Sequence, residues 1–167
     1  MKYIFHLIFL LLFAVIQPTW LEYTEVFGAK ANLFLVYTVV VSCYCGKKEG
    51  AVTGFVFGLV LDLFIGRIIG LNAVLMMILA FLTANFCEKV IRKNTLLITI
   101  LIVAITIPVY ELLYYTIAFL GDLEFKTAFL RTLLPECLCC IIATIPLYWI
   151  VKKAAKTLWD DKGEGIG

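Results

Sequence analysis

Hydrophobic residues occur along the chain in six long blocks that are separated by short polar segments. The blocks cover residues 3–20, 31–46, 51–66, 69–87, 96–120 and 127–151. A helix needs about 20 apolar residues to cross a bilayer, and such a run must be helical because lipid offers no partner for backbone amides. A β-barrel would alternate apolar and polar residues, and these blocks do not. The pattern predicts an all-α integral membrane protein, with a six-helix transmembrane bundle over residues 1–151 and a cytoplasmic tail over residues 152–167.

The composition supports this class. Of the 167 residues, 63% are apolar and 16% are charged, whereas soluble domains average about 45–50% and about 25%. The net charge of +2 is too small to favour a nucleic acid as partner. The six cysteines lie at the ends of apolar blocks or inside one, where free cysteine behaves as a small apolar residue. A metal site in the run Cys137, Cys139 and Cys140 is a minor alternative, because no histidine or further cysteine is near. No metal or cofactor is therefore predicted.

The basic residues divide unequally between the two sides of the predicted bundle. Six spans place alternate loops on the same side. One side would hold ten basic residues, Lys2, Lys47, Lys48, Lys89, Arg92, Lys93, Lys152, Lys153, Lys156 and Lys162. The other would hold four, Lys30, Arg67, Lys126 and Arg131. Because basic residues in short loops stay on the cytoplasmic side, both termini are predicted to be cytoplasmic.

The polar segments leave no room for a soluble catalytic domain, since none between the blocks exceeds about ten residues. The sequence has no glycine-rich phosphate loop, nucleophile elbow or zinc-protease motif. The only histidine, His6, lies near the start of the first block and is interpreted as a boundary residue. These features predict a protein that is not an enzyme.

Small residues recur at every fourth position in and around the third block. Five glycines and one acid follow this spacing, Gly50, Gly54, Gly58, Asp62, Gly66 and Gly70. Residues four apart share a helix face, and small residues there let two helix backbones approach closely in lipid. The positions from Gly54 to Gly70 are therefore predicted to form a helix-packing or partner face. A helix of the same chain is the favoured neighbour, and a second copy or another protein are the alternatives.

Three acidic side chains lie inside apolar blocks, where a carboxylate costs about 2.5–3.5 kcal/mol at the centre of a membrane helix. The predicted topology puts all three in the outer half of the bilayer, together with one asparagine. The predicted intramembrane polar cluster consists of Asp62, Asn72, Glu111 and Glu136. It could line a cavity for a ligand, or it could fix helix packing with Arg67 and Arg131 as partners. The structural interpretation is favoured.

The segment from Gly54 to Ala73, GFVFGLVLDLFIGRIIGLNA, resembles the rod shape-determining membrane protein family MreD. A glycine-rich helix with the core Leu59, Asp62 and Leu63 and a glycine-containing turn carries the resemblance. It implies a non-catalytic scaffold, in the bacterial cytoplasmic membrane, of the complex that elongates the wall of rod-shaped cells. The implied partners are MreC, a single-span membrane protein, and indirectly MreB, RodA and a class B penicillin-binding protein, besides membrane lipid.

The same family resembles the substrate-binding subunits of energy-coupling-factor transporters, which are small six-helix proteins that bind vitamins. The rival hypothesis is therefore a vitamin-binding subunit that uses the polar cluster as its ligand site. The two hypotheses share a fold, so the fold alone does not separate them. The Leu59, Asp62 and Leu63 core with its trailing glycines favours the scaffold.

Overall fold

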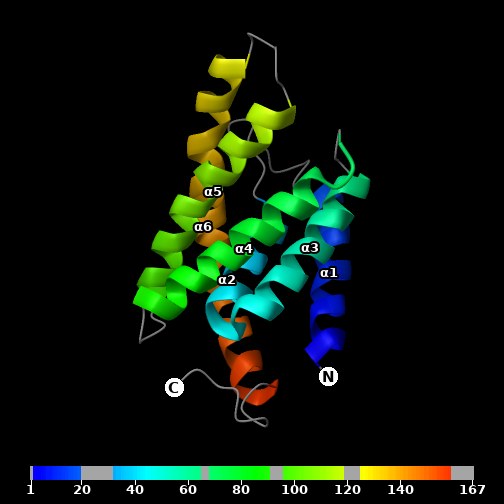
Figure 1. The fold of residues 1–167 in the computed structure, drawn as a ribbon, viewed down its shortest axis with the longest axis vertical. Helices are drawn as coiled ribbons and strands as arrows, with labels where there is room; N and C mark the ends of the chain where they lie inside the picture. Colours follow the sequence, from blue (N-terminus) through cyan, green and yellow to red (C-terminus); the bar gives the residue numbers. More distant parts are fainter. Residues whose placement is uncertain (1, 20–31, 65–67, 91–95, 119–124, 159–167) are drawn as a thin grey trace.

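The computed structural model describes residues 2–19, 32–64, 68–90, 96–118 and 125–158, and all regular structure in these ranges is helical. Figure 1 shows the helices side by side in one bundle. They are α1 (Lys2–Thr19), α2 (Leu33–Cys45), α3 (Lys47–Phe64), α4 (Leu71–Val90), α5 (Leu96–Ala118) and α6 (Phe125–Leu158). One helix falls in each apolar block, so the predicted all-helical class is confirmed.

Three of these helices are long and apolar enough to cross a membrane. The stretches are Leu71–Glu88 of α4, Leu96–Tyr114 of α5 and Pro135–Ala155 of α6. Two shorter apolar stretches are Tyr3–Ile16 of α1 and Leu33–Cys45 of α2. By length and composition, the described chain is that of a helical membrane protein.

Helix α2 lies at the centre of the bundle and contacts each of the other helices. Its side chains are buried continuously from Phe34 to Cys43, and most of them are apolar. A helix that is apolar all round is stable only when it is surrounded. The hydroxyl of Ser42 donates to the carbonyl of Thr38, 2.7 Å away, so this polar group is satisfied within the helix. The core of the protein therefore forms around α2.

Helix α1 is attached to the bundle through an aromatic stack. The ring of Tyr37 on α2 stacks between Phe9 on α1 and Phe57 on α3, with centroid separations of 5.0 and 5.1 Å. The hydroxyl of Tyr37 is also 2.8 Å from Nδ1 of His6 on α1. The predicted boundary residue His6 is therefore a buried packing residue, because the aromatic stack brings α1 against α2.

The helix boundaries differ most from the predicted ones at the start of α3 and at the end of α6. The third block was expected to begin at residue 51 after a basic loop, but α3 already begins at Lys47. Gly46 alone makes the turn, with φ of +86°, which residues with a Cβ rarely adopt. The sixth block was expected to end at residue 151, but α6 continues to Leu158. Lysine and alanine dominate this extension, and both are strong helix formers.

The arrangement brings the two ends of the described chain together. The first residues of α1 and the last turns of α6 lie at the same end of the bundle, the lower end in Figure 1. The short connection between α2 and α3 also lies at this end. There Lys47 and Glu88 form a part-exposed ion pair of 2.7 Å, between the start of α3 and the last turn of α4. Such pairs contribute little to stability.

The contact between α2 and α4 predicts an oxidative cross-link. The Sγ atoms of Cys43 and Cys87 lie 3.0 Å apart, and both residues are buried. Copper phenanthroline should join them in a chain whose other cysteines are replaced by serine, and the intact mass should fall by two hydrogen atoms. A Cys87→Ser chain is the matched control and should keep its mass. An unchanged mass in the first chain would contradict this packing of α2 on α4.

Candidate functional site

The carboxylate of Asp62 caps the first turn of α4. Its Oδ2 accepts the backbone N–H groups of Gly70 and Ala73, each at 3.0 Å, and its Oδ1 accepts that of Asn72 at 3.1 Å. Asp62 lies near the end of α3, and only 2% of its surface is exposed. The first N–H groups of a helix have no partner within that helix. Asp62 supplies that partner from the neighbouring helix.

These bonds explain why an acid is tolerated at this buried position. A hydrogen bond to a charged group contributes about 1.5–3 kcal/mol, and a carboxylate at a helix N-terminus also gains from the helix dipole. Three such bonds offset the cost of about 2.5–3.5 kcal/mol for a carboxylate at the centre of a membrane helix. Asp62 therefore stabilises the junction of α3 and α4.

The network continues from α4 to α5 and α2. The hydroxyl of Tyr110 on α5 donates to Oδ1 of Asn72, 2.5 Å away. It is also hydrogen-bonded to the side chain of Asn32. Oδ1 of Asn32 accepts the N–H of Leu35 at 3.1 Å and so caps the start of α2. Asp62, Asn72, Tyr110 and Asn32 thus form one polar network, which joins α2, α3, α4 and α5.

The other two predicted acids form a pair of their own. The side chains of Glu111 on α5 and Glu136 on α6 are hydrogen-bonded to each other. Glu111 is buried and Glu136 is partly buried. A bond between two carboxyl groups needs a proton on one of them, because an ionised carboxylate only accepts. This pair links α5 to α6.

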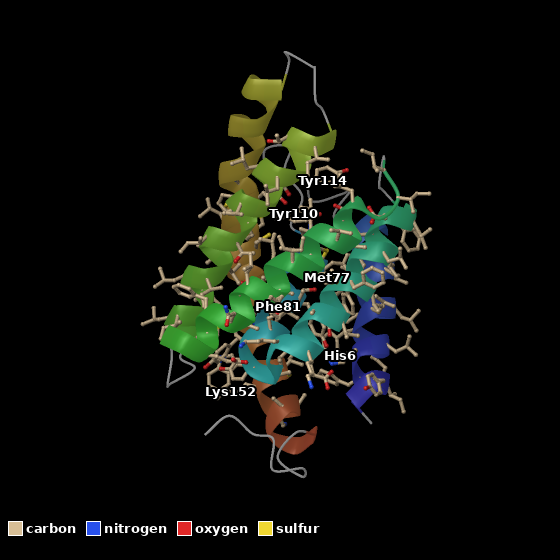
Figure 2. The ribbon with its side chains drawn as sticks, in the orientation of Figure 1. His6, Met77, Phe81, Tyr110, Tyr114 and Lys152 are labelled. Atoms are coloured by element: carbon tan, nitrogen blue, oxygen red, sulfur yellow. The ribbon has the colours of Figure 1, made fainter. Side chains whose placement is uncertain are left out.

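The predicted polar cluster is thus divided into two hydrogen-bonded parts. Asp62 and Asn72 belong to the network, and Glu111 follows Tyr110 directly on α5. Figure 2 shows Tyr110 toward one end of the bundle, with His6 and Lys152 toward the other. Arg67 and the side chain of Arg131, the expected cationic partners, lie outside the described residues.

No predicted cluster residue lines either of two hollows on the described surface. A hollow of about 130 Å³ lies between α1 and α3, bordered by His6, Glu49, Thr53 and mainly apolar side chains. The second lies on α6 near Trp149. The described ranges also contain no group of three or more histidine, cysteine or acidic side chains suited to a metal ion. The polar side chains of the predicted cluster instead contact one another and the backbone of their own chain.

The glycines of α3 lie against backbone of the neighbouring helices. A Cβ atom on Gly58 would be 2.6 Å from Cα of Ala73, and one on Gly54 would be 2.7 Å from the carbonyl oxygen of Met76. Both contacts are with α4. A Cβ on Gly50 would meet Ser42 of α2. The close neighbours of this face are therefore helices of the same chain.

The face does not extend to the last predicted glycine. α3 ends at Phe64, and Gly70 has φ of +95° with no atom within 4 Å of an added Cβ. Its place on the packing face was wrong, because the chain leaves the helix before the register of four reaches it. Gly70 instead serves the turn that presents N–H groups to Asp62. Gly66 lies outside the described residues.

Sequence reasoning missed Tyr110 and Asn32. Asn32 carries a local signal, since asparagine directly before an apolar helical run is a typical N-cap. Tyr110 carries none, because several tyrosines follow one another on α5 and only the fold shows which one faces Asn72.

These features define a helical membrane protein whose buried polar groups hold its helices together. The chain matches the family of the rod shape-determining protein MreD over residues 1–157 of its 167 residues. The protein belongs to the MreD family of rod shape-determining proteins. No curated protein and no solved structure showed significant similarity to the chain.

Proposed function

We propose that the protein is a non-catalytic membrane scaffold of the complex that elongates the wall of rod-shaped bacteria. The observation that carries this proposal is that Asp62 caps the first turn of α4. This acid lies in the segment that resembles the family, and backbone N–H groups of the same chain satisfy its carboxylate. A residue committed to helix packing fits a protein that works by keeping its shape and presenting surfaces to partners.

In the proposed topology all six helices cross the membrane, and both termini are cytoplasmic. The ten-to-four division of basic residues supports it, as does the placement of the start of α1 and the end of α6 at one end of the bundle. The N-terminal and C-terminal segments then both face the cytoplasm, which is the side on which basic residues of short loops are retained. The likeness of this arrangement to the energy-coupling-factor subunits stays a prediction.

The proposed partner is a single-span membrane protein of the MreC kind, through which MreB, RodA and a class B penicillin-binding protein are reached. Leu59 and Leu63, which flank Asp62 in the family-like segment, are exposed on the outer face of α3. One face of α1 is likewise exposed and apolar, with Ile4, Ile8 and Leu11 along it. These surfaces suit lipid or the helix of a partner, because helices associate in membranes by close packing.

The vitamin-binding alternative receives less support. A ligand site needs a concave pocket with a few polar groups that are directed at the ligand. The polar groups of Asn72 and Tyr110 are instead engaged with each other, and Glu111 is engaged with Glu136. The proposal therefore assigns these residues to the stability of the bundle.

A depletion experiment in the native rod-shaped host tests the proposed function. Depleted cells should become round and swell, added vitamins should not restore the rod, and the purified protein should retain a single-span membrane partner. Rescue by a plasmid copy of the wild-type gene is the control. Depleted cells that stay rod-shaped and regain growth on an added vitamin would contradict the scaffold and favour a vitamin-binding subunit.

A further inference from the structure

Two cysteines from different helices meet where α2 packs against α4. The S–H group of Cys87 on α4 donates a hydrogen bond of 3.0 Å to Sγ of Cys43 on α2. Both side chains are buried, with 4% and 3% of their surface exposed. A disulfide bond is about 2.05 Å long, so the two sulfur atoms need to approach by about 1 Å to be joined. Neither cysteine belongs to the polar network or to the paired glutamates.

The two thiols lie close to one end of the bundle. Cys43 is in the last turn of α2, and Cys87 is in the last turn of α4. Gly46 makes the turn beyond Cys43 without a side chain, and a Cβ atom there would be 4.0 Å from Oε1 of Glu88. Glu88 in turn forms the part-exposed ion pair with Lys47. The pair is therefore buried only about one helix turn below this end of the bundle.

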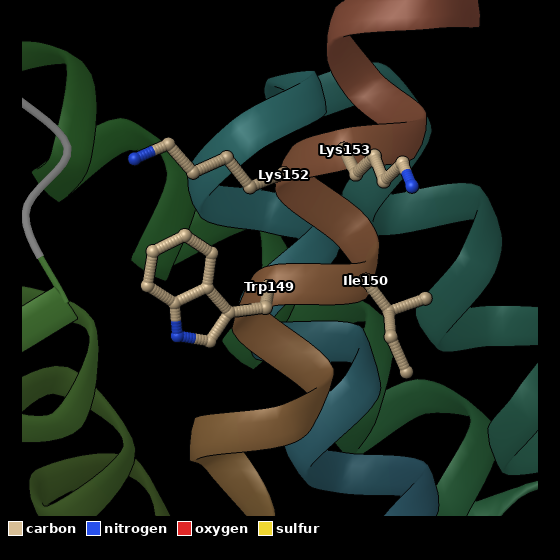
Figure 3. Close-up of a pocket in the computed structure, with 4 residues that line it drawn as sticks. All are labelled: Trp149, Ile150, Lys152 and Lys153. Carbon is tan, nitrogen blue, oxygen red and sulfur yellow. The ribbon is translucent and has the colours of Figure 1, made fainter.

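Aromatic rings hold α6 against the same end of α2. The ring of Tyr148 on α6 contacts that of Tyr44, the residue after Cys43, with centroids 5.4 Å apart. The Nζ atom of Lys152 lies 5.3 Å from the ring centroid of Tyr148 and donates a hydrogen bond of 3.4 Å to its hydroxyl. Figure 3 shows Lys152 beside the indole of Trp149 on this part of α6. Side chains of α6 therefore cover α2 directly beside Cys43.

A bond between the two sulfur atoms would close a loop over residues 43–87. This loop contains the whole of α3, the turn that follows it and most of α4. It therefore includes the Asp62 cap and the contact of Gly58 with α4. Closing a loop stabilises a fold in part because it restricts the unfolded chain. A cross-link at this point would hold together the hairpin of α3 and α4 and attach it to α2.

We propose that Cys43 and Cys87 form a redox modification site, at which a hydroperoxide converts the two thiols into a reversible disulfide. With hydrogen peroxide, one thiolate attacks a peroxide oxygen and the O–O bond breaks. That sulfur becomes a sulfenic acid, and the released hydroxide takes up the thiol proton to form water. The second thiol attacks the sulfenic sulfur, the S–O bond breaks, and the hydroxyl group leaves as water with the second thiol proton. The sulfur atoms lose two electrons, and the peroxide oxygens gain them.

The burial of the pair favours this class of oxidant, because hydrogen peroxide is small and uncharged whereas disulfide-forming proteins are too large to enter the bundle. In the topology given above, this end of the bundle faces the cytoplasm, where thiols are kept reduced. The dithiol is therefore the resting form. The second thiol also protects the first, since it forms the disulfide before the sulfenic acid is oxidised irreversibly. The site does not depend on the scaffold role or on any protein partner.

Counting the free thiols of the purified full chain tests this site. The protein in phosphatidylcholine vesicles is treated with hydrogen peroxide, denatured and labelled with N-ethylmaleimide, and its intact mass is measured. The reduced chain should take up six labels, one for each cysteine, and the oxidised chain should take up two fewer. Dithiothreitol added before labelling should restore all six. The oxidised chain should also unfold at a temperature higher by roughly 5–15 °C.

Serine variants show which thiols react. Cys45→Ser removes a thiol from the same end of α2, outside the pair, and should still lose two labels on oxidation and gain thermal stability. Cys87→Ser should lose no pair of labels, and its unfolding temperature should not rise with peroxide. Cys43→Ser removes the other sulfur atom and should behave in the same way. Circular dichroism of each variant checks that the helices are intact.

Three results would overturn the redox site. They are six labels on the peroxide-treated chain, a loss of labels that dithiothreitol does not reverse, and the same paired loss in Cys87→Ser. The last result would assign the disulfide to other cysteines of the chain. The readout involves no cell-shape phenotype, so its failure leaves the scaffold proposal to be judged by the depletion experiment.

Discussion

Replacing Gly58 with alanine should sharply lower the amount of folded protein in the membrane. The new Cβ would lie 2.6 Å from Cα of Ala73 and from the carbonyl oxygen of Asn72. Both are backbone atoms of α4, which cannot turn aside as a flexible side chain can. Overpacking of this kind costs about 1–3 kcal/mol. The cost falls at the start of α4, where Asp62 holds the N–H groups of Asn72 and Ala73.

The measurement is the midpoint of unfolding of the purified protein in mixed micelles, together with the protein level in membranes. Gly58→Leu should be worse than Gly58→Ala in both. Val74→Leu is a suitable control, because it adds one methylene to an exposed residue of α4 beside the contact. It should behave as wild type. Wild-type stability of Gly58→Leu would show that α3 and α4 do not approach as closely as described.

Asp62→Asn should also destabilise the protein, although the two side chains have nearly the same shape. The amide has one oxygen where the carboxylate has two, and its NH₂ group would face at least one of the three N–H groups. Each buried donor left without a partner costs about 1–3 kcal/mol. Burying a neutral amide in a membrane requires less free energy than burying a carboxylate, and this difference offsets part of the loss. We expect a net loss of roughly 1–3 kcal/mol, and a larger loss for Asp62→Ala.

Glu88→Gln is the matched control for Asp62→Asn. It makes the same change of acid to amide, but in the part-exposed ion pair with Lys47. Such pairs contribute about 0–1 kcal/mol, so this variant should unfold close to wild type. Hydrogen exchange adds a local measurement, since the N–H groups of Gly70 and Ala73 should exchange faster in Asp62→Asn only. Unchanged exchange there would contradict the capping role of Asp62.

The helices could be predicted because a long apolar block has one physical solution in lipid, and α4, α5 and α6 each contain such a stretch. Their ends could not be predicted as well. Gly46 makes a whole turn by itself, and sequence alone did not show that the adjacent basic residues begin α3 rather than form a loop. The end of α6 was missed for a related reason, because charge was taken to mark the end of the helix, whereas Lys152 and Lys153 continue it.

The candidate site, too, could be predicted only in part from the sequence. The spacing of Gly54 and Gly58 is a local pattern, and it pointed to the face that lies against α4. The burial cost of Asp62 marked it as important, but its three partners are backbone groups that no side-chain pattern reveals. Tyr110 contacts Asn72, which lies 38 positions earlier in the sequence. Such a contact exists only once the bundle has formed.

The cap on α4 bears on how the chain is inserted as it is made. α3 is not among the stretches apolar enough to cross a membrane by themselves, and it carries Asp62, whose partners on α4 are synthesised later. In the proposed topology, α3 entering alone would expose an unpaired carboxylate to lipid. α3 and α4 are therefore expected to leave the translocation channel as one hairpin, with the acid already paired to the turn that follows it.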